Sequence, residues 1–133
     1  RLSLKHQRAM KVLLSIKPEF ANKIFAGVKK FEFRKSIFKK PNISTIVVYA
    51  SSPVGKVIGE FEIGNIICDD IPQLWKKTEE YAGIDEQYFN EYFSEKDKGY
   101  AIGIKSTQLY PEKLCLKQTF GKRPPQSFLY LED

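Results

Sequence analysis

Cysteine and histidine are scarce in this sequence, and their scarcity argues against several kinds of site. The 133 residues include two cysteines, Cys68 and Cys115, and one histidine, His6. These three residues are scattered and form no Cys-x-x-Cys pair, so a zinc site is close to excluded and we expect no metal and no cofactor. Both thiols lie in apolar, strand-like settings, and we expect them to be reduced core residues of a cytoplasmic protein.

Long hydrophobic segments are also lacking. The apolar runs are only a few residues long, whereas a transmembrane helix needs about 20, so we predict a soluble protein with no membrane partner. No secretory hydrophobic region is present near the N-terminus, which favours the cytoplasm. Met10 is the single methionine, and a strand pattern begins directly after it. We therefore expect residues 1–9 to be an extension or a remnant of expression, and residues 10–133 to form one domain.

Charge is distributed unevenly along the chain. The formal net charge is +6, but residues 69–97 hold nine acidic residues and three lysines and so carry −6, which leaves +12 on the rest. Such a field suits a polyanionic partner such as nucleic acid, although surface charge also serves solubility. Charge alone leaves both interpretations open.

The apolar patterns predict sequential strands with a few helices. A helix is expected at residues 18–26, because proline suits a first helical turn and glycine follows a last one. A second helical region is expected at residues 71–93, with a break at Ala82-Gly83. Strands are expected at residues 11–16, 29–35, 44–50, 54–67, 99–109, 113–119 and 127–131. This order favours an α+β domain whose sheet closes into a small barrel.

Residues 29–40 are strongly basic, with six basic residues and one acid. Phe31 and Phe33 alternate with charged residues there, so we expect these two rings in the core rather than on a base-stacking surface. Glu32 shares a strand face with Arg34, and a carboxylate among cations keeps its charge. It could accept from a base amino group, position an arginine or act as a base, and a structural ion pair explains it as well.

The junction between the first strand and the first helix is a second candidate. Free N–H groups at a helix N-terminus attract anions, and Lys17 would stand beside them, although an ordinary exposed lysine fits equally well. The acidic residues of 69–97 are expected to form a solvated helical face. The aromatic residues there are expected to pack on the sheet, although one could line a base pocket. They are Trp75, Tyr88, Phe89, Tyr92 and Phe93.

The sequence GVKKFEFR at residues 27–34 resembles the G-x-K-x-x-E-x-R signature of ASCH domains, which are relatives of the PUA, EVE and YTH domains. Residues 15–25 are similar to the family's opening strand and helix start, and residues 124–128 to a frequent closing segment. The resemblance covers about residues 10–131. It implies a PUA-like, small mixed β-barrel with flanking α-helices.

The resemblance also implies a cleft between the barrel and the first helix that binds RNA or a modified nucleotide. Signature residues would face the cleft and residues around the helix start would form its rim. Strand order, rather than the signature, adds a far wall from the third strand. In that order the residues are Lys29, Glu32 and Arg34, then Ser15 and Lys17, then Tyr49 and Ser51.

Three functions stay open from the sequence. The first is an RNA- or nucleotide-binding module, regulatory in transcription or translation. The second is a hydrolase with Lys29 as nucleophile or base and Glu32 shuttling protons. Some relatives are amidohydrolases of N4-acetylcytidine with a G-x-K-T-x-T-x-R motif, whose threonine positions are Lys30 and Glu32 here, and other relatives are reported to cut RNA. The third is a protein-interaction domain that uses its acidic helices; the oligomeric state is open.

Overall fold

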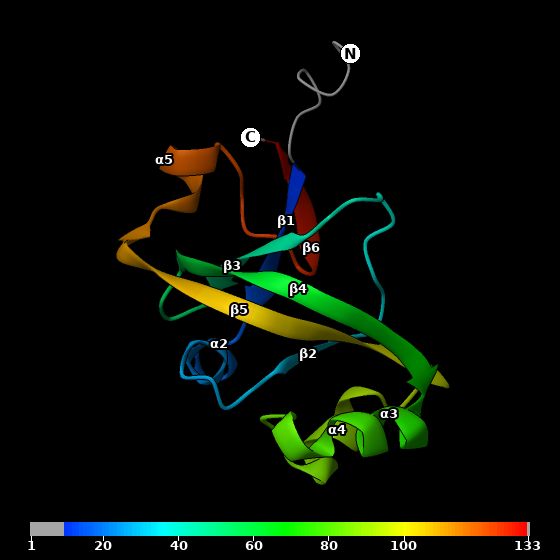
Figure 1. The fold of residues 1–133 in the computed structure, drawn as a ribbon. Helices are drawn as coiled ribbons and strands as arrows, with labels where there is room; N and C mark the ends of the chain where they lie inside the picture. Colours follow the sequence, from blue (N-terminus) through cyan, green and yellow to red (C-terminus); the bar gives the residue numbers. More distant parts are fainter. Residues whose placement is uncertain (1–9, 133) are drawn as a thin grey trace.

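A computed structural model describes residues 10–132 of the chain (Figure 1). The expected extension at residues 1–9, including His6, lies outside the described residues. In chain order the elements are β1 (Met10–Ile16), α2 (Pro18–Phe25), β2 (Phe31–Arg34), β3 (Thr45–Ala50), β4 (Lys56–Asp70), α3 (Ile71–Thr78), the 3₁₀ helix η1 (Glu79–Tyr81), α4 (Glu86–Tyr92), β5 (Lys98–Leu114), α5 (Leu116–Phe120) and β6 (Phe128–Glu132).

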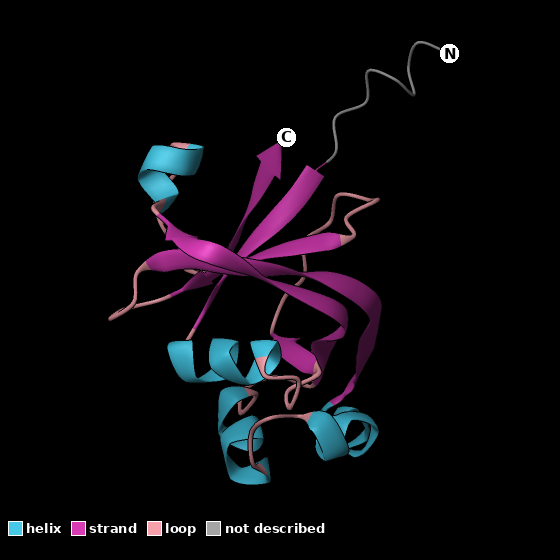
Figure 2. Cartoon of the chain, turned by 60° about the vertical axis from the view of Figure 1, so that its left-hand side comes forward, coloured by secondary structure: helices cyan, strands magenta, loops and turns pink. Residues whose placement is uncertain are grey.

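The strands form one six-stranded mixed sheet in the order β2-β5-β4-β3-β1-β6. β1 and β3 are parallel and the other neighbours are antiparallel. Long β4 and β5 cross the molecule together and twist strongly, as the register shifts in the pairings of β4 with β3 and with β5 allow (Figures 1 and 2). The α+β prediction is confirmed. The sheet does not close by strand pairing, however, so the expected barrel is only a loose description: β2 and β6 remain its edges.

Three apolar clusters hold these elements together. Alternation along β1 sends Val12 and Leu14 to one face, where they meet α2, and sends Leu13 to the other, where α5 and β6 cover it. The third cluster joins α3 and α4 to β2 and β5 around Phe33 and Phe89. Phe33 is buried there as expected, and Phe31 packs against the same cluster. The two helices therefore rest on the sheet through a core of their own.

The expected strand at residues 113–119 is wrong. β5 continues without a break to Leu114, and a turn of helix, α5, follows and ends at Gly121, whose φ is 67°. The alternation of Leu114 and Leu116 resembles a strand pattern, but Leu116 is buried from a helical turn, and Gly121 supplies the left-handed C-terminal residue that such a turn needs.

The expectation that both cysteines are core residues is wrong. Cys68 is exposed because it lies near the end of β4, where one face of the sheet is uncovered, and Cys115 is half-buried directly before α5. Both are free thiols.

The helical region with a break is confirmed. Asp70 and Asp85 cap α3 and α4 by accepting from the backbone N–H groups of Gln73 and Tyr88. The two helices lie together at the end of the sheet remote from α5 (Figure 1). None of the helices within residues 10–132 is long and apolar enough to cross a membrane.

Candidate functional site

A pocket of about 330 Å³ lies where the ends of β1 and β2 meet α2 and α4. This volume is at the small end of the range for ligand sites, about 300–1,000 Å³. It suits one small molecule or one unit of a polymer. The lining residues are Ser15, Ile16, Lys17, Phe20, Lys29, Glu32, Phe33, Arg34, Ser51, Ile84, Tyr88, Tyr92 and Gln126.

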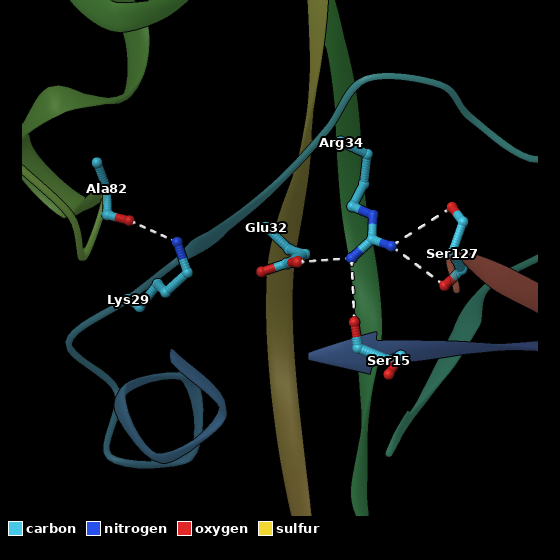
Figure 3. Close-up of polar contacts among 6 residues, drawn as sticks. All are labelled: Ser15, Lys29, Glu32, Arg34, Ala82 and Ser127. Carbon is cyan, nitrogen blue, oxygen red and sulfur yellow. Dashed lines mark hydrogen bonds and ion pairs between the residues drawn. The ribbon is translucent and has the colours of Figure 1, made fainter. Parts of the chain in front are cut away.

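Lys29 is the most unusual residue of the pocket, because its side chain is a buried cation. The residue is 2% exposed, and its Nζ donates to the backbone oxygen of Ala82 at 2.7 Å (Figure 3). The ammonium group also lies 4.8 Å from the ring centre of Phe33 and 5.5 Å from that of Phe20. Burial lowers the pKa of Lys29 to about 8, against the opposing effect of Glu32. Near neutral pH this amine can therefore gain or lose a proton.

The loop between η1 and α4 holds Lys29 in place. Lys23 Nζ donates to the Gly83 oxygen at 3.1 Å, and the backbone N–H of Lys30 donates to the Tyr81 oxygen at 2.9 Å. Gly83 has a φ of 73°, and a Cβ added to it would overlap the aliphatic part of the Lys29 side chain. A glycine is therefore required here both by the backbone conformation and by the close approach of Lys29.

Gly83→Ala is expected to lower the free energy of unfolding by about 2–4 kcal/mol, because an unfavourable backbone conformation adds to overpacking. Gly27→Ala is the matched control: Gly27 has a φ of 83°, but an added Cβ would meet nothing within 4 Å. The control is expected to lose only about 1 kcal/mol. Urea unfolding of both variants measures the difference, and equal losses would show that the contact with Lys29 has no energetic weight.

Glu32 and Arg34 form an ion pair on β2. Arg34 Nη1 donates to Glu32 Oε2 at 3.0 Å and to the Ser15 oxygen at 3.4 Å (Figure 3). Arg34 Nη2 donates to the oxygen of Ser127 at 3.1 Å and is 3.5 Å from its Oγ. Ser15 is in β1 and Ser127 directly precedes β6, so one guanidinium group bridges the two edges of the open sheet.

This arrangement separates the roles of the two side chains. Both terminal nitrogens of Arg34 are already engaged with protein acceptors, and these contacts hold the Glu32 carboxylate and the sheet edges together. Glu32 is 6% exposed, and its second carboxylate oxygen lies on the side of Lys29 (Figure 3). The pocket therefore presents an amine and a carboxylate oxygen close together. Within residues 10–132, no cluster of three or more His, Cys, Asp or Glu side chains could hold a metal ion.

The structure brings six of the seven predicted site residues together. Tyr49 is the exception: it is buried in the cluster of Leu13 and Val47 and does not line the pocket. The six that line it are Ser15, Lys17, Lys29, Glu32, Arg34 and Ser51.

The sequence does not identify the pocket residues that come from α4 and from the segment before β6. The possibility that an aromatic residue of the acidic segment lines a pocket holds for Tyr88 and Tyr92, but the sequence gives no means of choosing them over Phe89, which is buried. Burial raises the pKa of the Tyr92 hydroxyl, so this group stays a hydrogen-bond donor. The role of Gln126 as a lining residue has no local signal, because only the return of the chain to β6 brings it to the pocket.

The ASCH domain family model matches residues 14–108. The chain therefore belongs to the ASCH domain family, as its signature suggested. A protein of Zymomonas mobilis subsp. mobilis named ASCH domain-containing ribonuclease is 34% identical over 122 residues, which cover 90% of this chain and 82% of that protein. The crystal structure of ASCH from Zymomonas mobilis superimposes with a TM-score of 0.83 at 32% identity and covers 91% of this chain and 87% of that one.

A more distant relative is a longer protein. The large ribosomal subunit protein uL22 of Ureaplasma parvum is 25% identical over 121 residues, which are 91% of this chain but only 39% of that protein.

Proposed function

We propose that the chain binds single-stranded RNA with one nucleotide in the pocket and cleaves the RNA beside it. The observation that carries this proposal is the pair of Lys29, with a pKa of about 8, and Glu32 in one small pocket. A titratable amine beside a carboxylate is what general acid–base catalysis near neutral pH requires. The name of the Zymomonas mobilis relative, a ribonuclease, supports the choice of RNA as substrate.

The lining supports a flat, anionic ligand. Three half-buried aromatic rings line the pocket, and an unpaired base can stack on such rings. Three cationic side chains line it against one carboxylate, so the site carries excess positive charge that suits a phosphate. The three rings belong to Phe20, Tyr88 and Tyr92.

The chemistry can proceed by attack of the neighbouring ribose hydroxyl. Glu32 would take the proton of the 2′-hydroxyl while the 2′-oxygen forms a bond to phosphorus. The bond from phosphorus to the 5′-oxygen breaks, and Lys29, protonated at this stage, would donate its proton to that leaving oxygen. The products are a 2′,3′-cyclic phosphate and a 5′-hydroxyl, and a proton returns from Glu32 to Lys29 before the next cycle. Arg34 keeps the Glu32 carboxylate in position throughout.

Glu32→Gln is expected to reduce cleavage of a short single-stranded RNA by about 100-fold or more, the usual contribution of a general base. Product ends identified by mass spectrometry should carry the cyclic phosphate in the wild type. A matched RNA with one 2′-deoxynucleotide at the cleavage position should stay intact there, because the nucleophile is absent.

Glu62→Gln is the control for this experiment. Glu62 is an exposed carboxylate of β4 that accepts from Ser106 and lies outside the pocket. The Glu62→Gln variant should cleave the RNA at the wild-type rate. Full activity in Glu32→Gln, with circular dichroism showing a folded protein, would contradict the proposed role of this pocket in cleavage.

Binding of RNA or a modified nucleotide without cleavage is the second candidate. It is favoured by the engagement of Glu32 in an ion pair and of Lys29 with the Ala82 oxygen, contacts that also serve a purely structural purpose. Retained RNA binding by the wild type with no product under any condition would select this candidate. A regulatory role in transcription or translation and a cytoplasmic location remain predictions.

A further inference from the structure

Two exposed lysines stand beside tyrosines at the mouth of the pocket. Lys17, between β1 and α2, donates from Nζ to the Tyr88 hydroxyl at 3.2 Å. Lys35, directly after β2, places its Nζ 4.8 Å from the ring centre of Tyr92. Tyr88 and Tyr92 both line the pocket, so each lysine marks one place on its rim.

The two tyrosines lie about one helical turn apart on α4. Both belong to α4, and residues four apart lie on the same face of a helix, one above the other. A rise of about 1.5 Å per residue separates them by about 6 Å along the helix axis. The two lysines therefore stand beside successive turns of α4, an order that suits contacts to two successive phosphates of one strand.

Both lysines keep their charge available for a ligand. In the described part of the chain, neither amine forms an ion pair: the partner of each is a neutral tyrosine. Lys77 and Lys11, by contrast, pair with Asp69 and Glu60. Because Lys17 and Lys35 are exposed, an approaching phosphate would meet them without first breaking an ion pair.

We propose that the pocket takes an internal nucleotide of a single-stranded RNA, with the phosphates on its two sides bound by Lys17 and Lys35. This inference rests on the proposed function and specifies its substrate: a chain that enters and leaves the site, rather than a free nucleoside or a terminal nucleotide. The small pocket supports it, because a volume of about 330 Å³ holds little more than one nucleotide, so the chain on either side of that nucleotide has to pass along the rim.

Binding of a trinucleotide tests the inference apart from cleavage. The probe is a fluorescently labelled RNA trinucleotide whose central sugar is 2′-deoxy, so that the wild-type protein cannot cut it there by the proposed route. Lys17→Gln and Lys35→Gln should each raise the dissociation constant about tenfold, as loss of one charged hydrogen bond does. Each should also reduce the slope of log K against log salt by about 0.7, the contribution of one phosphate on a single strand.

Neutral linkages identify which phosphate each lysine binds. A methylphosphonate on one side of the central nucleotide should weaken wild-type binding but leave one of the two lysine variants unaffected, and a methylphosphonate on the other side should do the same for the other variant. Lys113→Gln and Lys117→Gln are the matched controls, since both lysines are exposed near α5 at the remote end of the sheet (Figure 1).

The outcomes separate this inference from the proposed function. Equal losses in the rim and control variants, or binding of a free nucleoside as tight as that of the trinucleotide, would overturn the internal-nucleotide inference and leave cleavage untouched. Unimpaired cleavage by Glu32→Gln would count against the proposed function, whatever the rim lysines do.

Discussion

Replacing Arg34 with methionine is expected to lower the free energy of unfolding by about 3–5 kcal/mol, the usual cost of removing one partner of a buried ion pair. The Glu32 carboxylate, 6% exposed, would lose its cationic partner. The backbone oxygens of Ser15 and Ser127 would lose donors at the same time, and with them the link between the two edges of the sheet. Urea unfolding measures the loss directly.

A double variant separates the cost of the unpaired Glu32 charge from the cost of losing the Arg34 hydrogen bonds between the sheet edges. Replacing Glu32 and Arg34 together by methionine removes both charges, so the remaining cost is that of the unsatisfied backbone oxygens and should be smaller than that of Arg34→Met alone. Arg34→Lys keeps a charge but lacks the planar fork that reaches three partners, and it should fall between the wild type and Arg34→Met. A double variant less stable than Arg34→Met would contradict the buried-charge explanation.

The elements nearest the site are those that the sequence predicts best. The strand at β1, the helix at α2 and the strand at β2 follow from local signals: alternation, a proline at the helix start and Gly27 after its end. The polar face of Glu32 and Arg34 follows from the same alternation, which also allows the ion pair that the structure contains. Local sequence suffices there because each signal acts within a few residues.

The rest of the site depends on contacts that no local pattern encodes. Arg34 forms a hydrogen bond with Ser127, which lies 93 residues away in the sequence, and Lys29 forms one with Ala82, which lies 53 residues away. Burial of Lys29 was not predicted, since lysine is among the residues least often buried. Tyr49 faces the wrong side of the sheet for the pocket, on a strand whose register shifts just before it. Pairing across the whole chain determines these positions.

The stability of the protein is expected to rise with pH relative to a Lys29→Met variant. The pKa of Lys29 is about 8 in the folded protein against 10.5 in the unfolded chain. Below about pH 8 the amine is charged in both states, so its burial opposes folding. Between about pH 8 and 10.5 the unfolded chain binds more protons, so stability rises with pH by up to about 3 kcal/mol in total. The difference between wild type and Lys29→Met in urea unfolding at pH 7 and pH 10 measures this rise.

Cleavage should respond to the same titration with the opposite sign. Because the proposed mechanism needs Lys29 protonated as the acid, the rate should fall as pH rises through about 8, while stability increases. Lys29→Met should lose about 100-fold to 10,000-fold in rate and should no longer show this fall in its residual activity. Lys113→Met, at an exposed position of β5, should keep both the rate and the profile of the wild type. If Lys29 is the proton donor, its titration must appear both in the stability and in the cleavage rate. A stability difference that grows with pH, together with a cleavage rate that does not change with pH, would confirm Lys29 as a buried amine but exclude it as the proton donor.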